Sequence, residues 1–513
     1  MRKANLNIEV YRDSVLGCWM GKNVGGTLGT PFEGTHEMPQ VDFYTEELDG
    51  RPLANDDLDL QLIWLQAAED YGIYHLTPRI LAEYWLNFVA APMGEYRNCI
   101  SNLQSGFYPP LSGSCNNDAL RWSNGGWIRS EIWACFFPGS PDEAARYAYI
   151  DACADHEGEG IWAEVFTASL ESAAFINHDI FQLLKLALAR IEPDCRIGKS
   201  VKYAMHLYSA GTEFATARNK MVEFNQETGF FQAPQNIGFL VLALLYGNGD
   251  FEKTILNAVR CGDDTDCTAA TAGAVLGIIH GINALPAKWC DPVGKDIITK
   301  CLSGFGMQIP KNIMELTERT IAVAERALPE NPALINISNA PNDFTEFYIT
   351  DKSETPKLIG MRSPYEVSLE MPFARVGAVL VNGPQIVSGE SKQIHFILHS
   401  ISQIMGTLKI ELLMPETWKA EPCCSLLVSG IGLGPQGGEV ECSIIPGEIY
   451  EPVTFLPVRF TMFGRSMPEI RMIPLQLRGS VDSRIITRNG DEYVRQALRR
   501  GDKKIFPQQE LSF

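Results

Sequence analysis

The sequence predicts a multidomain α + β protein, with an all-α helical domain over residues 1–335 and a C-terminal antiparallel β-sandwich over residues 336–513. Apolar residues recur at helical spacing through the first region. In the second region, short alternating or β-branched runs are separated by Gly, Pro and Asn turns. The segment Pro329-Glu330-Asn331-Pro332 marks the change of character, and 513 residues are too many for one ordinary hydrophobic core.

The helical pattern is clearest in six segments of the first region. In one of them, Leu58, Leu62 and Leu65 form a single apolar stripe. In another, Ser140-Pro141-Asp142-Glu143 supplies a cap, a proline at the first helical position and acids in the first turn. The predicted helices are Asp57–Tyr71, Pro141–Cys153, Ile180–Ile191, Asn236–Tyr246, Cys267–Ile282 and Ile313–Ala327.

The segment Cys267–Ile282 differs from the other five because Gly273, Gly277 and Gly281 recur at a spacing of four. Glycine costs about 1 kcal/mol in a helix relative to alanine, so something must compensate. A smooth glycine face would let a neighbouring helix approach closely, and the alternative is ordinary tight core packing of small residues. Both interpretations make this helix central and its N-terminal end rigid.

The second region contains five strand-like runs, followed by a charged segment, Arg488–Phe513, that we expect to be peripheral. His395 and His399 fall in one run, where four residues span about 13 Å, too far to share an ion. Because the cysteines also show no CxxC pair, a zinc site is not expected. The predicted strands are Val376–Val381, Ile394–Leu398, Thr407–Leu413, Ser425–Val428 and Pro452–Thr461.

Charge and composition restrict the class of partner. The 43 Lys and Arg against 62 Asp and Glu give a net charge of −19, which disfavours binding to nucleic acid or to an anionic membrane. No run of about eighteen apolar residues predicts a membrane span, and the N-terminus has no clear signal-peptide pattern. The 13 cysteines fit reduced thiols in a core. We therefore expect a cytoplasmic protein, and the sequence allows a homo-oligomer.

Two acidic clusters are the most informative feature of the chain: Asn55-Asp56-Asp57-Leu58-Asp59 and Gly262-Asp263-Asp264-Thr265-Asp266. Each opens an apolar helical pattern, so N-capping is one interpretation. One Asp is enough to cap a helix, however, and crowded carboxylates repel one another unless a cation lies between them. The other interpretation is a site for a hard divalent cation such as Mg²⁺. Spacing alone does not decide between the two.

Further polar segments are candidates for chemistry. Glu33 follows Pro31 and Phe32, so it is either a desolvated carboxylate suited to proton transfer or a solvated loop residue. The glycines before it lack the pattern of a nucleotide P-loop. The loop Asn124-Gly125-Gly126-Trp127-Ile128-Arg129 fits either a sugar site or a structural turn. His156 lies among carboxylates, which would favour the charged form of its imidazole. The alternative is that His156 is an ordinary hydrogen-bonding residue.

Taken in order, these segments resemble the ADP-ribosylglycohydrolase family, which are all-helical enzymes that remove ADP-ribose from proteins with a binuclear Mg²⁺ centre. The resemblance runs from about residue 14 to residue 290, and the last block is the most specific. Gly17–Glu33 resembles the glycine-rich segment that opens the family domain, and Asn55-Asp56-Asp57-Leu58 lies where the family has Thr-Asp-Asp-Thr. Asn124–Arg129 resembles the family's Asn-Gly-x-x-x-Arg loop, and His156 matches its histidine. Asp264-Thr265-Asp266-Cys267, followed by Leu285-Pro286-x-x-Trp289, resembles its Asp-Thr-Asp-Thr signature with the trailing Pro-x-x-Trp.

The resemblance implies a Mg²⁺-dependent hydrolase of a glycosidic bond, with one or two ions and a small-molecule or protein-attached sugar as substrate. Asn55 replaces a Thr but can still offer a carbonyl oxygen to Mg²⁺, and two further positions depart more strongly: Leu58 offers no ligand, and Cys267 replaces a hydroxyl with a soft sulfur. The implied residues are Glu33 and Asp57 for catalysis, Asn124, Gly125, Gly126, Trp127, Arg129 and His156 for the substrate, and Asn55, Asp56, Asp57, Asp264, Asp266 and Cys267 for the metal.

Two alternatives to this function stay open. In the first, the same scaffold acts on another glycoside, such as a furanoside, a nucleoside or a glycan fragment. The changed ligand positions and the added sandwich motivate it. In the second, the chain is a catalytically inactive binding or structural relative. Leu58 and Cys267 favour this second alternative, whereas Glu33 and the four aspartates that match the family argue against it.

Overall fold

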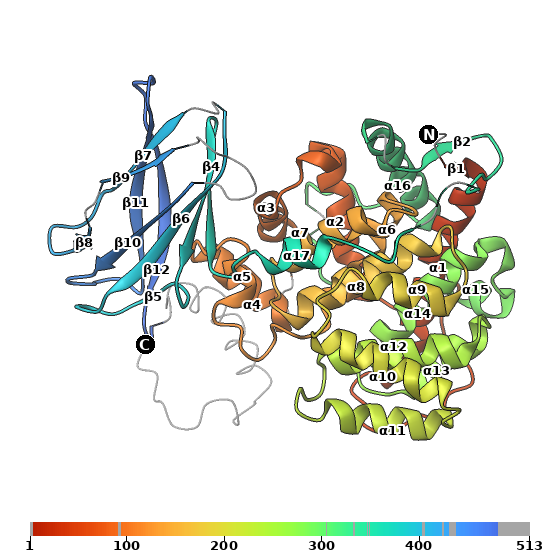
Figure 1. Ribbon diagram of the computed structural model, residues 1–513. Coiled ribbons are helices and arrows are strands. Elements are labelled where there is room, and N and C mark those ends of the chain that lie inside the picture. Colours follow the sequence, from red (N-terminus) through yellow and green to blue (C-terminus); the bar gives the residue numbers. More distant parts are fainter. Residues whose placement is uncertain are drawn as a thin grey trace. The chain divides into compact units, whose positions relative to one another are not determined.

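The computed structural model describes residues 4–90, 94–303, 305–331, 334–345, 347, 349–402, 406–422, 425–429 and 438–480. The chain divides into two compact units, one formed by Met1–Cys99 with Ser112–Arg362 and one by Ile100–Leu111 with Ser363–Phe513. The first unit is helical, and most strands belong to the second (Figure 1). The predicted class is therefore confirmed: an N-terminal helical domain precedes a domain rich in antiparallel sheet. The boundary at residues 335 and 336 stays a prediction.

All six predicted helices are present in the helical unit. They are α2 (Asp56–Tyr71), α7 (Pro141–Ala152), α9 (Ile180–Leu188), α12 (Ala233–Gly247), α14 (Thr265–His280) and α16 (Ile313–Ala327). The further helices are α1 (Ile8–Gly29), α3 (Pro78–Phe88), α4 (Gly94–Gln104), α5 (Leu111–Ser114), α6 (Glu131–Phe136), α8 (Glu159–Ala174), α10 (Arg196–Ser209), α11 (Phe214–Asn225), α13 (Phe251–Arg260), α15 (Ala287–Val293) and α17 (Thr355–Gly360).

Short elements complete the helical unit. The parallel pair β1 (Asn5–Asn7) and β2 (Asn336–Ser338) ties the start of the chain to the segment after α16. Two 3₁₀ turns belong to the candidate site described below: η1 (Thr30–Phe32) directly follows α1, and η3 (Trp127–Arg129) directly precedes Ser130 and α6. The others are η2 (Ile73–His75), η4 (Ile282–Ala284) and η5 (Leu328–Glu330).

Helices α1 and α14 are in direct backbone contact at the centre of the helical unit. A Cβ atom added at Gly21 would clash with the carbonyl oxygen of Gly273, and one added at Gly25 would clash with that of Ala269. The order of these pairs makes the two helices antiparallel, so the end of α1 lies beside the start of α14. Thr265 Oγ1 accordingly donates to the carbonyl oxygen of Gly29 at 2.8 Å. The predicted close approach along the glycine face is confirmed.

The second unit contains two five-stranded sheets. All pairings are antiparallel except β12 with β5. Alternate residues of β6 and β11, such as Phe396 and Phe460, are buried, as two facing sheets require. In order, the sheets are β3 (Glu366–Met371), β4 (Ala374–Leu380), β6 (Lys392–Ile401), β10 (Glu439–Ile445) and β8 (Lys419–Glu421), then β5 (Gln385–Ile386), β12 (Glu469–Leu477), β11 (Val453–Met462), β7 (Thr407–Leu412) and β9 (Ser425–Ser429).

The five predicted strands correspond to β4, β6, β7, β9 and β11 and are confirmed. His395 and His399, both on β6, pair with different glutamates, Glu441 and Glu366. The predicted charged tail, Arg488–Phe513, lies outside the described residues.

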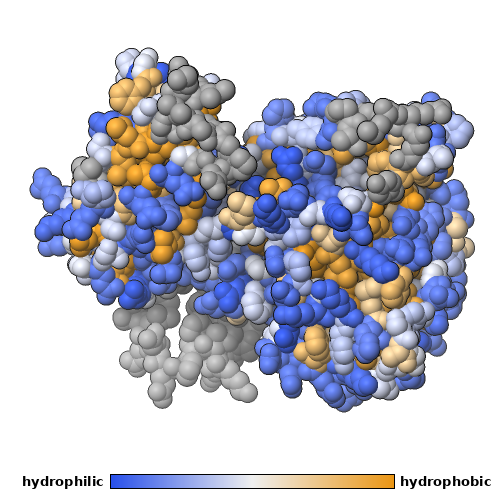
Figure 2. Space-filling model, viewed as in Figure 1, coloured by the Kyte–Doolittle hydropathy of each residue, from blue (hydrophilic) through white to orange (hydrophobic). Residues whose placement is uncertain are grey.

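The surface and the cysteines agree with the composition. Hydrophilic residues dominate the visible face of the helical unit (Figure 2). Every cysteine in the described ranges is a free thiol, and nearly all are buried. None of the described helices is long and apolar enough to cross a bilayer.

Candidate metal and active site

Carboxylates from three separate segments converge at one end of the α1–α14 contact. Asp57, Asp266 and Cys267 offer ligand atoms that all lie within 4.8 Å of one another, and we name them the inner cluster. The ligand atoms of Glu33, Asp264 and Asp266 also lie within 4.8 Å of one another, and these three residues form the outer cluster. Asp266 belongs to both. The starts of α2 and α14, some two hundred residues apart in sequence, therefore meet in space, as the sequence led us to expect.

Three oxygens in these clusters have no hydrogen-bond partner among the described residues. They are Asp57 Oδ2, Asp264 Oδ1 and Asp266 Oδ1, and each is buried. A buried polar atom without a partner costs about 1–3 kcal/mol, and more when it is charged. Hard oxygen ligands gathered in this way fit a divalent cation such as Mg²⁺. The residues present therefore fit the implied metal.

Capping does not account for these acids. Asn55 is the N-cap of α2, and its Oδ1 accepts from the backbone N–H of Asp57 at 2.9 Å. Asp264 occupies the N-cap position of α14 but makes no side-chain capping bond. Asn55 fills the capping role at α2, and Asp264 makes no capping bond at α14. Capping therefore does not explain the carboxylates of Asp57, Asp264 and Asp266.

Burial governs the acidity of the site. It raises the pKa of Asp57 well above its usual range, opposed by the charge of Lys22, and it raises that of Asp264, with Asp266 adding to the effect. The side chain of Glu33 reaches solvent, yet desolvation and then Asp266 raise its pKa to about 7. Glu33 can therefore exchange a proton near neutral pH, which favours the first of its two sequence interpretations.

Cys267 occupies the position where the family pattern has a hydroxyl. Its Sγ donates to Asp57 Oδ1 at 3.3 Å. Burial, and then the charges of Asp264 and Asp57, raise the pKa of the thiol well above its usual value, so it stays protonated. The hydroxyl of the neighbouring Thr268 donates to the backbone oxygen of Asp264 at 2.6 Å. Cys267 thus serves Asp57 as a neutral donor in this structure.

The remaining acids of the two motifs hold the backbone in place. Asp263 has a positive φ of 64°, and its carboxylate accepts from the backbone N–H of Phe231 and from Gln235 Nε2. Asp59 is completely buried, and its Oδ2 accepts two backbone N–H groups that lie far along the chain. Neither residue belongs to either cluster.

The polar loop at residues 124–129 supports the outer cluster. Asn124 Nδ2 donates to Asp264 Oδ2 at 2.6 Å, and Trp127 Nε1 donates to Asn124 Oδ1 at 3.0 Å. The backbone N–H of Gly125 donates to Glu95 Oε1 at 3.0 Å. Trp127 is 0% exposed and holds Asn124 in this structure, and its stacking on a sugar stays a prediction.

Arg129 lies behind this loop and is fully buried. Its guanidinium donates to Asp151 Oδ1, to both oxygens of Asp155 and, at 2.7 Å, to the backbone oxygen of Gly125. In this structure its bonds run to buried acids and to the loop backbone, and the substrate contact that the resemblance implied stays a prediction. We therefore assign Arg129 to positioning the loop.

His156 and Gly126 also lie in this buried region. His156 Nδ1 is 2.7 Å from Asp155 Oδ1, and its Nε2 is 3.2 Å from Ser123 Oγ. A Cβ at Gly126 would come close to Nδ1 of His156 and to Glu164. The imidazole is 1% exposed, so in this structure it supports the loop and does not face solvent.

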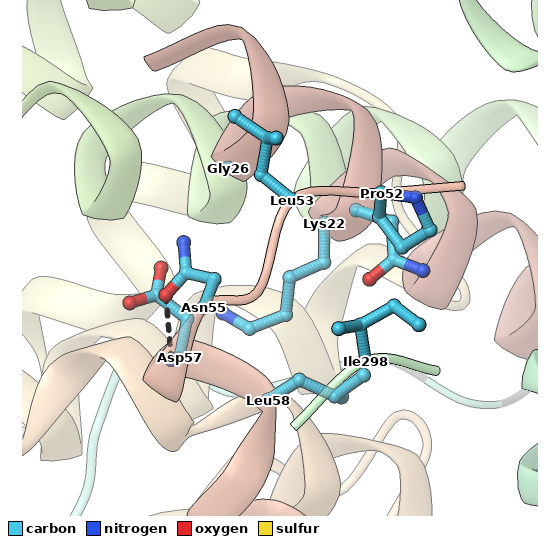
Figure 3. A pocket seen from close by; sticks show the side chains of 9 residues that line it. Lys22, Gly26, Pro52, Leu53, Asn55, Asp57, Leu58 and Ile298 are labelled. Atoms are coloured by element: carbon cyan, nitrogen blue, oxygen red, sulfur yellow. Dashed lines mark hydrogen bonds between the residues drawn. The ribbon is translucent and has the colours of Figure 1, made fainter. Parts of the chain in front are cut away.

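Sequence reasoning missed a buried lysine beside Asp57. Lys22 on α1 is 2% exposed and donates at 2.7 Å both to Glu131 Oε1 and to the backbone oxygen of Ile128. Its side chain runs toward Asp57 along a narrow pocket (Figure 3). The cavity volume is about 10 Å³, close to the space of one water, so a sugar does not fit there. The only sequence signal was one lysine in an otherwise uncharged stretch, residues 14–29.

Two further residues near the site carried no sequence signal, Glu95 beside the polar loop and Lys300 beside Asp56. Lys300 Nζ donates to Asp56 Oδ1 at 3.1 Å. Asp56, which was expected to bind metal, is therefore already paired with a cation. Leu58, the other departure from the family pattern, lines the narrow pocket.

Comparisons with known proteins agree with this geometry. The family model described as ADP-ribosylglycohydrolase matches residues 7–327. An uncharacterized protein of Archaeoglobus fulgidus is 24% identical over 288 residues, which are 53% of this chain and 89% of that protein. ADP-ribosylarginine hydrolase Tri1 of Pseudomonas putida is 30% identical over 81 residues, 16% of this chain and only 19% of that protein. Because the family model matches more than half of the chain, this protein belongs to the ADP-ribosylglycohydrolase family.

Proposed function

We propose that this protein is a Mg²⁺-dependent hydrolase that cleaves the glycosidic bond between ADP-ribose and the group to which it is attached. Family membership suggests hydrolysis of a glycosidic bond. The observation that carries the metal is the set of three buried, unpaired carboxylate oxygens on Asp57, Asp264 and Asp266. The similarity to a protein named as an ADP-ribosylarginine hydrolase supports ADP-ribose as the sugar.

Asp264 and Asp266 would hold an ion in the outer cluster, with Glu33 at its solvent side, and Asp57 would offer an oxygen to an ion in the inner cluster. A bound Mg²⁺ would supply positive charge that offsets these acids and orients sugar hydroxyls and a water. Asn124 fixes Oδ2 of Asp264 by its hydrogen bond, which leaves Oδ1 of the same carboxylate free. The thiol of Cys267 does the same for Asp57, where Oδ2 stays free.

Proton transfer falls to Glu33. With a pKa of about 7, its carboxylate can take a proton from the attacking water and return it to the leaving group. The oxygen of that water forms the new bond to the anomeric carbon as the glycosidic bond breaks. The negative charge of Asp57 and its neighbours would stabilise an oxocarbenium-like transition state.

The test is a hydrolysis assay with a panel of substrates, run with Mg²⁺ and with EDTA. The panel contains ADP-ribosylated peptide, simple furanosides and a nucleoside. We expect release of ADP-ribose from the peptide, loss of release in EDTA, and loss of both activity and Mg²⁺ binding in Asp264→Asn without loss of the fold. Cleavage of only the furanosides or the nucleoside would overturn the substrate, and equal rates with EDTA would overturn the metal.

A further inference from the structure

A lysine whose side chain is 40% exposed lies at one side of the acid site. Lys300 Nζ lies 3.1 Å from Asp56 Oδ1, and the side chain of Asp56 is only 18% exposed. Burial disfavours the charge on Lys300, but Asp56 above all, and then Glu33 and Asp266, hold its pKa above the usual value. The side chain is therefore an ammonium at neutral pH, and its charge acts on acids of both helix starts.

The fold determines where this ammonium lies. Asp59, one helical turn after Asp56, accepts the backbone N–H groups of Lys300 and Cys301 with a single oxygen, each at 2.7 Å. The carbonyl oxygen of Cys301 in turn accepts from the backbone N–H of Ala90 at 2.8 Å. The peptide that carries Lys300 is thus bonded to the same first turn of α2 that supplies Asp56.

Most oxygens on the α2 side of the site are already occupied. Asn55 Oδ1 accepts the capping N–H of Asp57, Asp57 Oδ1 accepts the thiol of Cys267, and Asp56 Oδ1 accepts the ammonium of Lys300. Leu58 adds no ligand atom. Of the buried oxygens without a partner, Asp57 Oδ2 and Asp59 Oδ1 remain on this side. Asp59 belongs to neither cluster, and Asp57 Oδ2 lies close to a second ammonium, that of Lys22.

The α14 side differs in this respect. Asp264 Oδ1 and Asp266 Oδ1 are both buried and have no partner in the described part of the chain. Glu33 joins them within 4.8 Å and is the most open of the three to solvent. Oxygens available to a hard cation are therefore concentrated in the outer cluster.

We propose that the Lys300 ammonium supplies, beside Asp56, the positive charge that a second divalent ion would otherwise supply, so that each chain binds one ion in the outer cluster, held by Asp264 and Asp266 with Glu33 at its solvent side. The proposal rests on the metal site of the proposed function and departs from the binuclear centre that the resemblance implies. A tethered ammonium offsets one carboxylate without ligand exchange, whereas a second Mg²⁺ bound at Oδ1 of Asp56 would have to displace Lys300.

The test counts bound Mn²⁺, used as the probe, by calorimetry and by electron paramagnetic resonance of the full chain. We expect one Mn²⁺ per wild-type chain and a signal without spin coupling. Lys300→Met removes the charge but keeps the length of the side chain, and it should admit a second, coupled Mn²⁺. Lys300→Arg keeps the charge and should bind one. Lys199→Met, at an exposed lysine on α10, is the matched control and should also bind one.

Each of the other outcomes would contradict one specific part of the proposal. Two Mn²⁺ ions in the wild type would overturn this inference and leave the proposed hydrolase intact. One Mn²⁺ in a folded Lys300→Met protein would overturn the role of Lys300. No Mn²⁺ bound in the wild type would overturn the metal site itself, and with it the proposed function. The wild-type count decides the first and last cases even when the methionine variant does not fold.

Discussion

Asn124 joins the polar loop to the start of α14, because its Nδ2 donates to Asp264 Oδ2 at 2.6 Å while its Oδ1 accepts from Trp127. The carboxylate of Asp264 is thereby held in one orientation, with Oδ1 directed away from this bond and unpaired. A residue of the predicted sugar loop thus orients a carboxylate that we propose as a metal ligand. The loop and the metal site are parts of one network.

We predict that Asn124→Ala weakens Mg²⁺ binding by about 10–100-fold, the usual effect of removing a residue that orients a metal ligand. The fold-decrease in Mg²⁺ affinity should be larger than the fold-increase in KM for the substrate, measured at saturating Mg²⁺. Calorimetric titration with Mg²⁺ measures the first quantity. Asn87→Ala, at an exposed position on α3, is the control and should leave it unchanged. Wild-type Mg²⁺ affinity in Asn124→Ala would contradict the orienting role.

Glu33→Gln should lower kcat by about 10²–10⁴-fold, the range for loss of a general acid or base. In the wild type, kcat should rise as pH increases through about 7, because Glu33 must lose its proton to accept one from water. The glutamine variant should lack this limb of the pH profile. Glu46→Gln, at an exposed loop position, is the matched control. A pH limb that persists in Glu33→Gln would assign the titration to another group.

Much of this site could be predicted from the sequence, because the signals were local. Crowded aspartates at two helix starts, and glycines repeated every four residues along α14, each lie within one segment. Lys300 and Glu95 could not be predicted, since their partners, Asp56 and the loop backbone, lie far away in the chain.

The surroundings of Arg129 could not be predicted for a related reason. A polar loop has the same composition whether its arginine faces a substrate or a buried acid. Only the fold shows that Asp151 and Asp155 surround this guanidinium. The fold class was easier to predict, because the period of the apolar pattern changes from helical to alternating near residue 330.

The metal-free protein should lose stability as pH rises. Asp57 and Asp264 have folded-state pKa values well above the unfolded value of about 3.9, so the unfolded chain gives up these protons first. Their contribution to stability is fully present below about pH 4 and is lost as pH rises through the folded pKa values. Bound Mg²⁺ favours the carboxylate forms and opposes this loss.

The increase in Tm on adding Mg²⁺ should therefore be larger at pH 8 than at pH 5, measured by thermal unfolding against an EDTA reference. Asp264→Asn should reduce the increase at pH 8, because it removes both a titrating acid and a metal ligand. An equal increase at the two pH values would mean that these carboxylates are not coupled to the metal.

The backbone contact between α1 and α14 predicts that added volume at Gly21 affects stability and activity together. A Cβ there meets the carbonyl oxygen of Gly273, which cannot move without the helix, so Gly21→Ala should destabilise the fold by about 1–3 kcal/mol or more. Gly198→Ala on α10, where a Cβ finds only ordinary contacts, should be neutral or slightly stabilising. Denaturant unfolding measures both.

Separation of the helices at Gly21 would also draw Asp264 and Asp266, at the start of α14, away from Glu33, just after the end of α1. Mg²⁺ affinity should therefore fall in Gly21→Ala under conditions in which the protein is still folded, and unchanged affinity there would mean that the helix contact does not set the spacing of the outer cluster.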